Sequence, residues 1–134
     1  MKAKRKYFTE QEFWESLNSS QLFNIRSPPP QLPQIFTYSN GAIYQGLMRG
    51  GFRDGFGLMR WPDGASYEGD WVYGRAQGHG TFIHTIGDTY SGQWIRDRAC
   101  AYGEYTSAVN GGTYKGEWKD DMQEGHGVEE WGKD

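Results

Sequence analysis

The stretch Tyr67-Glu68-Gly69-Asp70-Trp71, followed shortly by Gly78-His79-Gly80, decides how this chain is interpreted. The same arrangement, a Tyr-x-Gly-x-Trp run and then Gly-x-Gly, recurs in units that begin at Tyr44, Tyr67, Tyr90 and Tyr114. The intervals between these tyrosines are 23, 23 and 24 residues. A fixed period of this length is typical of proteins that are built from stacked structural repeats.

The spacing inside each unit predicts a β-hairpin. Tyr, Gly and Trp stand at i, i+2 and i+4, which are positions that share one face of a strand. A second break follows each Gly-x-Gly, at Pro62-Asp63-Gly64, at Ile86-Gly87 and at Asn110-Gly111-Gly112. Two short alternating runs separated by glycine indicate a hairpin. Because one hairpin is marginal alone, we expect neighbouring hairpins to stack.

The recurring glycines and rings predict an aromatic spine along the stack. Glycine weakens a strand interior unless something needs the space that a side chain would take. We expect the Tyr and Trp rings to lie over the bare backbone of neighbouring strands, with about 0.5–1.5 kcal/mol for each ring pair beyond area burial. The expected spine residues are Tyr44, Gly46, Tyr67, Gly69, Trp71, Tyr90, Gly92, Trp94, Tyr114, Gly116 and Trp118.

This pattern resembles the MORN repeat, named for membrane occupation and recognition nexus, from Tyr44 to the C-terminus. Three departures stand out: Met48 replaces a Trp, Ala101 replaces a Gly, and one extra residue lies near Asn110. We expect a negative φ at Ala101, since alanine disfavours the left-handed region. The resemblance implies an all-β fold, a single-layer solenoid of stacked antiparallel β-hairpins.

We expect the chain to divide into two parts. Residues 35–134 form the solenoid, which opens with a half repeat over 35–43 because that stretch matches the second half of a unit. Residues 1–34 hold a basic tail, a short helix over about 9–18 and a Pro-rich linker. Thr9 and Glu12 form a capping box at the start of this helix.

Two groups of apolar residues are candidates for partner binding. The first is Phe13, Trp14 and Leu17 on the short helix, which either dock on the chain's own sheet or anchor a partner. The second lies on the sheet face opposite the spine and consists of Leu47, Leu58 and Ile83. An apolar patch of this kind suggests a docking surface, although scattered surface hydrophobes are common.

Charge excludes nucleic acid as a partner. The net charge is −3, and the first six residues carry +4, so the remainder carries −7. An acidic solenoid will not hold nucleic acid or anionic lipid by bulk electrostatics. Membrane contact, if it occurs, would use only four basic residues, for which a solvated tail is the simpler interpretation; they are Lys2, Lys4, Arg5 and Lys6.

We predict no catalytic site, no cofactor and no metal site. The Gly-x-Gly elements open no helix and precede no Gly-Lys-Ser/Thr, so they are not phosphate loops. His79, His84 and His126 lack the cysteine or carboxylate partners of a metal site. Cys100 is the only cysteine, which excludes an internal disulfide and favours a reducing compartment.

The resemblance implies a non-enzymatic scaffold or adaptor. MORN proteins are found mostly in eukaryotic cytoskeletal, ciliary and membrane-contact assemblies, so an intracellular location, in the cytoplasm, cytoskeleton, cilium or an organellar complex, is expected. One alternative is a regulatory module of a lipid kinase or lysine methyltransferase; another is a peripheral phospholipid-binding module. The strand near Trp131 would form an exposed edge, so we expect a partner, a second copy or further sequence to cover it.

Overall fold

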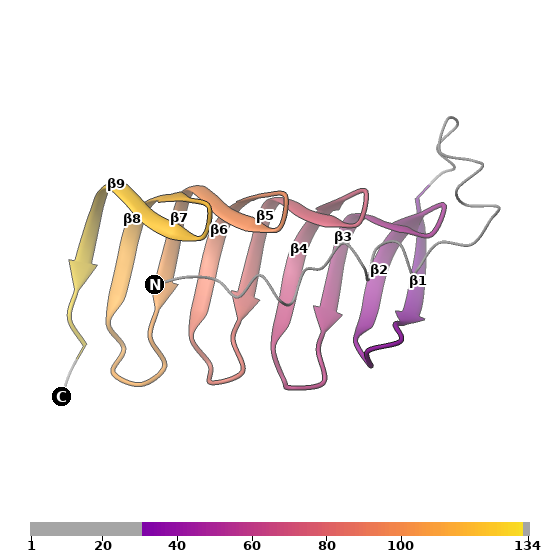
Figure 1. Ribbon diagram of the computed structural model, residues 1–134, viewed down its shortest axis with the longest axis horizontal. Coiled ribbons are helices and arrows are strands. Elements are labelled where there is room, and N and C mark those ends of the chain that lie inside the picture. The colour runs from indigo at the N-terminus through magenta and orange to yellow at the C-terminus, as the bar shows by residue number, and fades with distance from the viewer. Residues whose placement is uncertain (1–30, 133–134) are drawn as a thin grey trace.

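The computed structural model describes residues 31–132, which form one antiparallel sheet of nine strands in chain order. Figure 1 shows the strands side by side in a single layer, with β1 and β9 at opposite ends. The strands are β1 (Leu32–Thr37), β2 (Ile43–Arg49), β3 (Phe52–Arg60), β4 (Ser66–Val72), β5 (Arg75–Ile83), β6 (Thr89–Ile95), β7 (Arg98–Thr106), β8 (Thr113–Lys119) and β9 (Met122–Glu130).

The predicted all-β class is confirmed, and residues 31–132 contain no helix. The helix expected over about 9–18 and most of the Pro-rich linker lie outside the described residues. Strand β1 starts at Leu32, so the sheet includes residues 32–34, which the sequence analysis assigned to the linker. Pro33 is compatible with this position because β1 is an edge strand, where a missing backbone donor is tolerated.

A row of glycines crosses the sheet at one register. From β2 to β9 every neighbouring pair of strands places glycine opposite glycine, as in Gly57↔Gly69 and Gly69↔Gly80. The tyrosine that begins each repeat lies over this row. A Cβ added to Gly80 would stand 2.2 Å from the Tyr67 hydroxyl, and one added to Gly69 would stand 2.4 Å from the Gly80 Cα. No side chain larger than hydrogen fits at these positions.

Each repeat also contains a bulge beside the glycine row. The register between β6 and β7 shifts between Gly92 and Trp94, and corresponding shifts occur in the other repeats. The bulged strands have a left-handed residue here: φ is 103° at Gly55, 104° at Gly78 and 61° at Ala101. The prediction of a negative φ at Ala101 is therefore wrong. The bulge imposes the left-handed backbone, which costs an alanine roughly 1–2 kcal/mol.

Two-residue turns join the two strands inside each repeat. Both turn residues have positive φ in all four turns, including Tyr73 (46°) with Gly74 (82°) and Arg96 (49°) with Asp97 (68°). These values match the type I′ turn, whose twist agrees with the right-handed twist of the flanking strands. The turns therefore hold the strands of each hairpin in the register that aligns the glycines.

Replacing Gly80 with alanine is expected to destabilise the sheet by about 1–3 kcal/mol, because the new methyl group would overlap the Tyr67 hydroxyl. The matched control is Gly111→Asn: this turn residue has φ 73°, which asparagine tolerates, and a Cβ there meets nothing within 4 Å. Urea unfolding followed by circular dichroism measures both. Equal stability of Gly80→Ala and the unchanged protein would contradict the steric account.

Candidate interaction surfaces

The spine is a continuous series of edge-to-face ring contacts on the inner face, meaning the sheet face that carries the Tyr-x-Gly-x-Trp side chains. Trp94 contacts Tyr67 of the preceding repeat at 5.3 Å between ring centroids and Tyr90 of its own repeat at 5.1 Å. Trp71 and Trp118 make the same two contacts, at 5.0 to 5.6 Å. The rings from Tyr44 to Tyr114 therefore form one chain of contacts.

Hydrogen bonds fix the orientation of each ring. Trp94 Nε1–H donates to the carbonyl of Gly80 at 3.0 Å, across the boundary between repeats. Trp71 and Trp118 donate in the same way to Gly57 and Gly103. The spine tyrosines donate to the carbonyl three residues ahead, at 2.7 to 3.0 Å. The side chain of Met48 takes the corresponding position in the first repeat and is buried.

Burial raises the pKa of the Tyr44, Tyr67 and Tyr90 hydroxyls well above the usual value near 10. Each hydroxyl therefore stays protonated and continues to donate its hydrogen bond even in alkaline solution where an exposed tyrosine ionises. Of the spine rings, Trp71, Trp94 and Tyr67 are at most 1% exposed. The spine supplies rigidity, and it leaves little surface of its own for a partner.

Aspartates in the turns clip consecutive repeats together, a role that the sequence analysis missed. Asp97 accepts a hydrogen bond from the backbone N–H of Ala76 at 2.7 Å, and its own N–H donates to the Ala76 carbonyl at 3.0 Å. Asp121 holds Ala99 by the same pair of bonds. The signal in the sequence is an aspartate at the second turn position, repeated 24 residues later.

The contact between the first and second repeats has no turn aspartate and is built from other residues. Gly74 stands where the later turns have aspartate, and Arg53 stands where the later repeats have alanine. Arg53 is 2% exposed. Its guanidinium donates to the Gly74 carbonyl and lies 5.0 Å from the Tyr38 ring centroid and 4.8 Å from that of Trp71. Contacts with aromatic faces offset part of the free energy that is lost when a guanidinium is removed from water.

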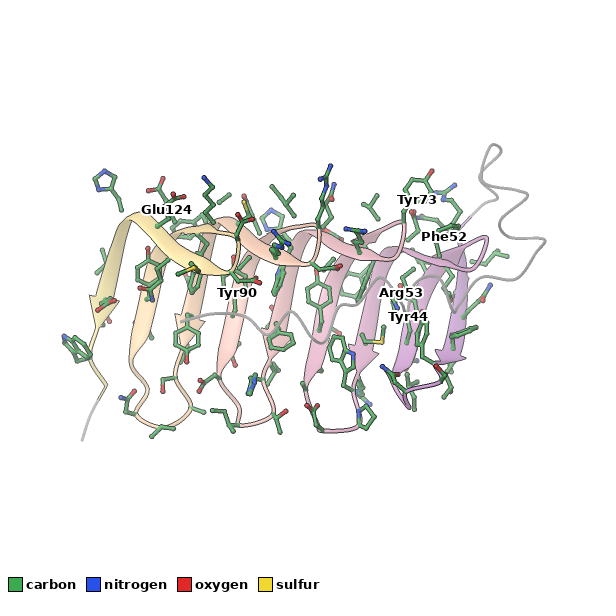
Figure 2. The ribbon with its side chains drawn as sticks, in the orientation of Figure 1. Tyr44, Phe52, Arg53, Tyr73, Tyr90 and Glu124 are labelled. Carbon is green, nitrogen blue, oxygen red and sulfur yellow. The ribbon has the colours of Figure 1, made fainter. Side chains whose placement is uncertain are left out.

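The β4–β5 turn, which contains Tyr73, packs against Phe52 of β3. Figure 2 shows Phe52 and Tyr73 close together at the ends of the strands, where the turns lie; their ring centroids are 5.6 Å apart and the rings stand at nearly a right angle. Phe52 is 6% exposed, whereas Tyr73 is 47% exposed. The arginine and this ring pair hold the β2–β3 hairpin against the next repeat.

The outer face, opposite the spine, carries an apolar patch on the first three strands. The structure places Leu47 and Leu58 there, half-buried, and adds three residues that the sequence analysis did not single out; these are Ile35, Ile43 and Phe56. Ile35 and Leu58 flank Gln45 from the two neighbouring strands, and Ile43 and Leu47 flank it along β2, so the apolar side chains surround one polar residue on this face. We call these five residues the outer apolar patch.

The remaining partner candidates fall elsewhere. Ile83 is exposed on the outer face of β5 but is separated from Ile43 by Arg60 and Ser66. Phe13, Trp14 and Leu17 lie outside the described residues, as do the basic residues Lys2, Lys4, Arg5 and Lys6.

Within residues 31–132, His, Cys, Asp and Glu side chains form no group of three that could hold a metal ion. His79 and His126 are exposed on the outer face, while His84 is half-buried at a turn. Cys100 is a free, half-buried thiol. The part of the chain that the structure describes has no helix long and apolar enough to cross a membrane.

Substitution of Trp94 with phenylalanine should reduce the free energy of unfolding by about 1–3 kcal/mol, since it leaves the Gly80 carbonyl without its donor. Trp131→Phe is the matched control: the Trp131 side chain is 87% exposed, so its replacement should change stability by less than about 0.5 kcal/mol. Chemical unfolding of the two variants measures the difference. Equal losses would show that the indole hydrogen bond does not join the repeats.

The sequence matches the model of a known repeat family. The family model for the MORN repeat matches residues 44–66, 67–89, 90–111 and 114–133, which together make up more than half of the chain. No curated protein matches the chain significantly. MORN repeats are consistent with a module that binds proteins or membranes. The chain is therefore a member of the MORN-repeat family.

Proposed function

We propose that this chain is a non-enzymatic scaffold that binds a protein partner through the outer apolar patch. The observation that carries the proposal is the exposure of large apolar side chains on adjacent strands: Ile35 is 71% exposed, Phe56 56% and Ile43 45%. Contiguous apolar patches on a soluble protein mark interaction sites more often than they mark an idle surface.

The architecture supports binding by this face. The inner face is filled by the spine, whose rings and hydrogen bonds keep the sheet rigid. A rigid platform holds its surface side chains in place before the partner arrives, which reduces the entropy lost on binding. Leu47 and Leu58 are already half-buried beside the exposed members, so a partner would complete a partly formed apolar cluster.

The charge of the sheet favours protein over membrane as the partner. Apart from the first six residues the chain carries −7, so a surface of anionic lipid would repel it. We further propose that the partner belongs to a large eukaryotic assembly, at the cytoskeleton, cilium or an organelle. This part of the proposal rests on the resemblance to MORN scaffolds.

The test uses the full chain with two surface substitutions, Ile43→Lys and Phe56→Lys, made together. Both side chains are exposed, so the fold should persist. The control pair is Ile86→Lys and Val109→Lys, which are 62% and 85% exposed and lie in turns away from the patch. Each tagged protein is expressed in and purified from cells of the organism that encodes it. The co-purifying proteins are quantified by mass spectrometry.

We expect a stoichiometric partner with the unchanged protein and the control pair, and at least a tenfold loss with the patch variant. Loss of the partner from both variants, or no stoichiometric partner at all, would contradict the proposal. Co-sedimentation with phosphatidylserine vesicles that the uncharged pair Ile43→Gln and Phe56→Gln abolishes would instead assign the patch to a membrane.

A further inference from the structure

Each boundary between repeats contains the same slot for an indole. Trp71, Trp94 and Trp118 pack edge-on against the tyrosine of the preceding repeat, at 5.1 to 5.6 Å between centroids. Each also donates its Nε1–H to a glycine carbonyl of that repeat, at 3.0 to 3.1 Å. The slot therefore consists of a tyrosine ring and a carbonyl on the strand that precedes the next repeat.

Within residues 31–132, no tryptophan from a following strand occupies the corresponding slot beside β9. Its tyrosine is Tyr114, and its carbonyl belongs to Gly127, which is exposed, whereas Gly103 at the same place in the preceding repeat is buried. Among the described strands β9 pairs only with β8, and Figure 1 shows it at the end of the sheet. A hollow of about 200 Å³ lies here, lined in part by Tyr105, Tyr114 and Trp131.

A carboxylate stands in the position of a core side chain next to this slot. Glu129 faces Tyr114 across β8 and β9, just as Phe82 faces Tyr67 and Met59 faces Tyr44. Met59 and Phe82 are at most 2% exposed, but Glu129 is exposed and lines the hollow. A strand that covered this position with a neutral ring would bury an unpaired charge, which is strongly unfavourable.

The register of the internal boundaries defines what a covering strand must carry. Where β5 meets β6, Tyr90 faces Phe82 and Trp94, four residues later, faces Gly78. Where β7 meets β8, Tyr114 and Trp118 hold the same relation to Tyr105 and Ala101. A strand added antiparallel to β9 in this register places residue i opposite Glu129 and residue i+4 opposite Gly125.

We propose that the β9 edge binds a protein partner by strand addition, and that the partner strand carries Lys or Arg at position i and Trp at position i+4. The basic side chain pairs with Glu129, and the indole enters the slot formed by Tyr114 and Gly127. Glu124, which projects at the β9 end of the sheet in Figure 2, and Glu130 are exposed and attract the same basic strand.

A second copy of this chain does not satisfy the proposal. None of its six tryptophans is preceded four residues earlier by Lys or Arg; the residues at those positions are Glu10, Gly57, Tyr67, Tyr90, Tyr114 and Gly127. Residues 1–134 therefore contain no Lys/Arg-x-x-x-Trp segment that could serve as the occupant. This inference is independent of the outer apolar patch, which lies on the opposite face and at the other end of the sheet, so either proposal can fail alone.

The probe is a blocked heptapeptide with the sequence of residues 113–119 in which Tyr114→Lys provides the basic residue four positions before Trp118. It is titrated into the full-length ¹⁵N-labelled protein, and amide shifts are followed by NMR. Two further peptides carry either Trp118→Ala beside the same lysine or Tyr114→Glu in its place. The protein variant is Glu129→Gln, with Glu104→Gln on the exposed outer face of β7 as its control.

We expect saturable shifts in β9 and in residues 107–112. Loss of the peptide's indole should weaken binding at least tenfold, as for a central anchor residue, and Tyr114→Glu in the peptide should prevent saturation. Glu129→Gln should weaken binding about threefold to fivefold, in the range of a cross-strand charge pair, and Glu104→Gln should leave it unchanged. Absence of saturable shifts at millimolar peptide, shifts elsewhere, or equal binding by all three peptides would overturn the proposal.

Discussion

A tyrosine ring lying over a glycine of the neighbouring strand is the contact on which the rest of this structure depends. The Tyr67 hydroxyl leaves no room for a Cβ on Gly80, and the ring in turn presents its edge and face to Trp71 and Trp94. Because the glycines face one another from β2 to β9, the same contact recurs in every repeat. The bulges, the positive-φ turns and the hydrogen bonds of Asp97 and Asp121 to the preceding repeat all maintain that register.

A sheet held together in this way is one-dimensional. Each repeat contacts its neighbours, and no second layer covers the described sheet, so its stability is the sum of repeat and boundary contributions. The inner face cannot vary without loss of the spine, whereas the outer face and the edges can. Both surfaces proposed for recognition, the outer apolar patch and the β9 edge, lie where side chains differ from repeat to repeat.

Much of the fold could be predicted because its determinants are local and periodic. Tyr-x-Gly-x-Trp at a constant interval implies strands, a shared face and stacking, and Pro62-Asp63-Gly64 marks a turn. Features that depend on the register of the bulge could not be predicted. They include the left-handed Ala101, the bonds of Asp97 to Ala76, and the place of Glu129 in the row of core side chains, because each requires knowledge of which residue faces which.

The central claim is that contacts between adjacent repeats are sufficient to specify this fold. Deletion of residues 67–89, one full period, tests it most directly, since it brings Tyr90 after Ser66 and offers Trp94 to the ring of Tyr44. The account predicts that the shortened protein still unfolds cooperatively in urea, with a smaller m-value because it exposes less surface on unfolding. Deletion of residues 67–78, half a period, should prevent folding. A full-period deletion with no cooperative transition, or a half-period deletion that folds equally well, would contradict the account.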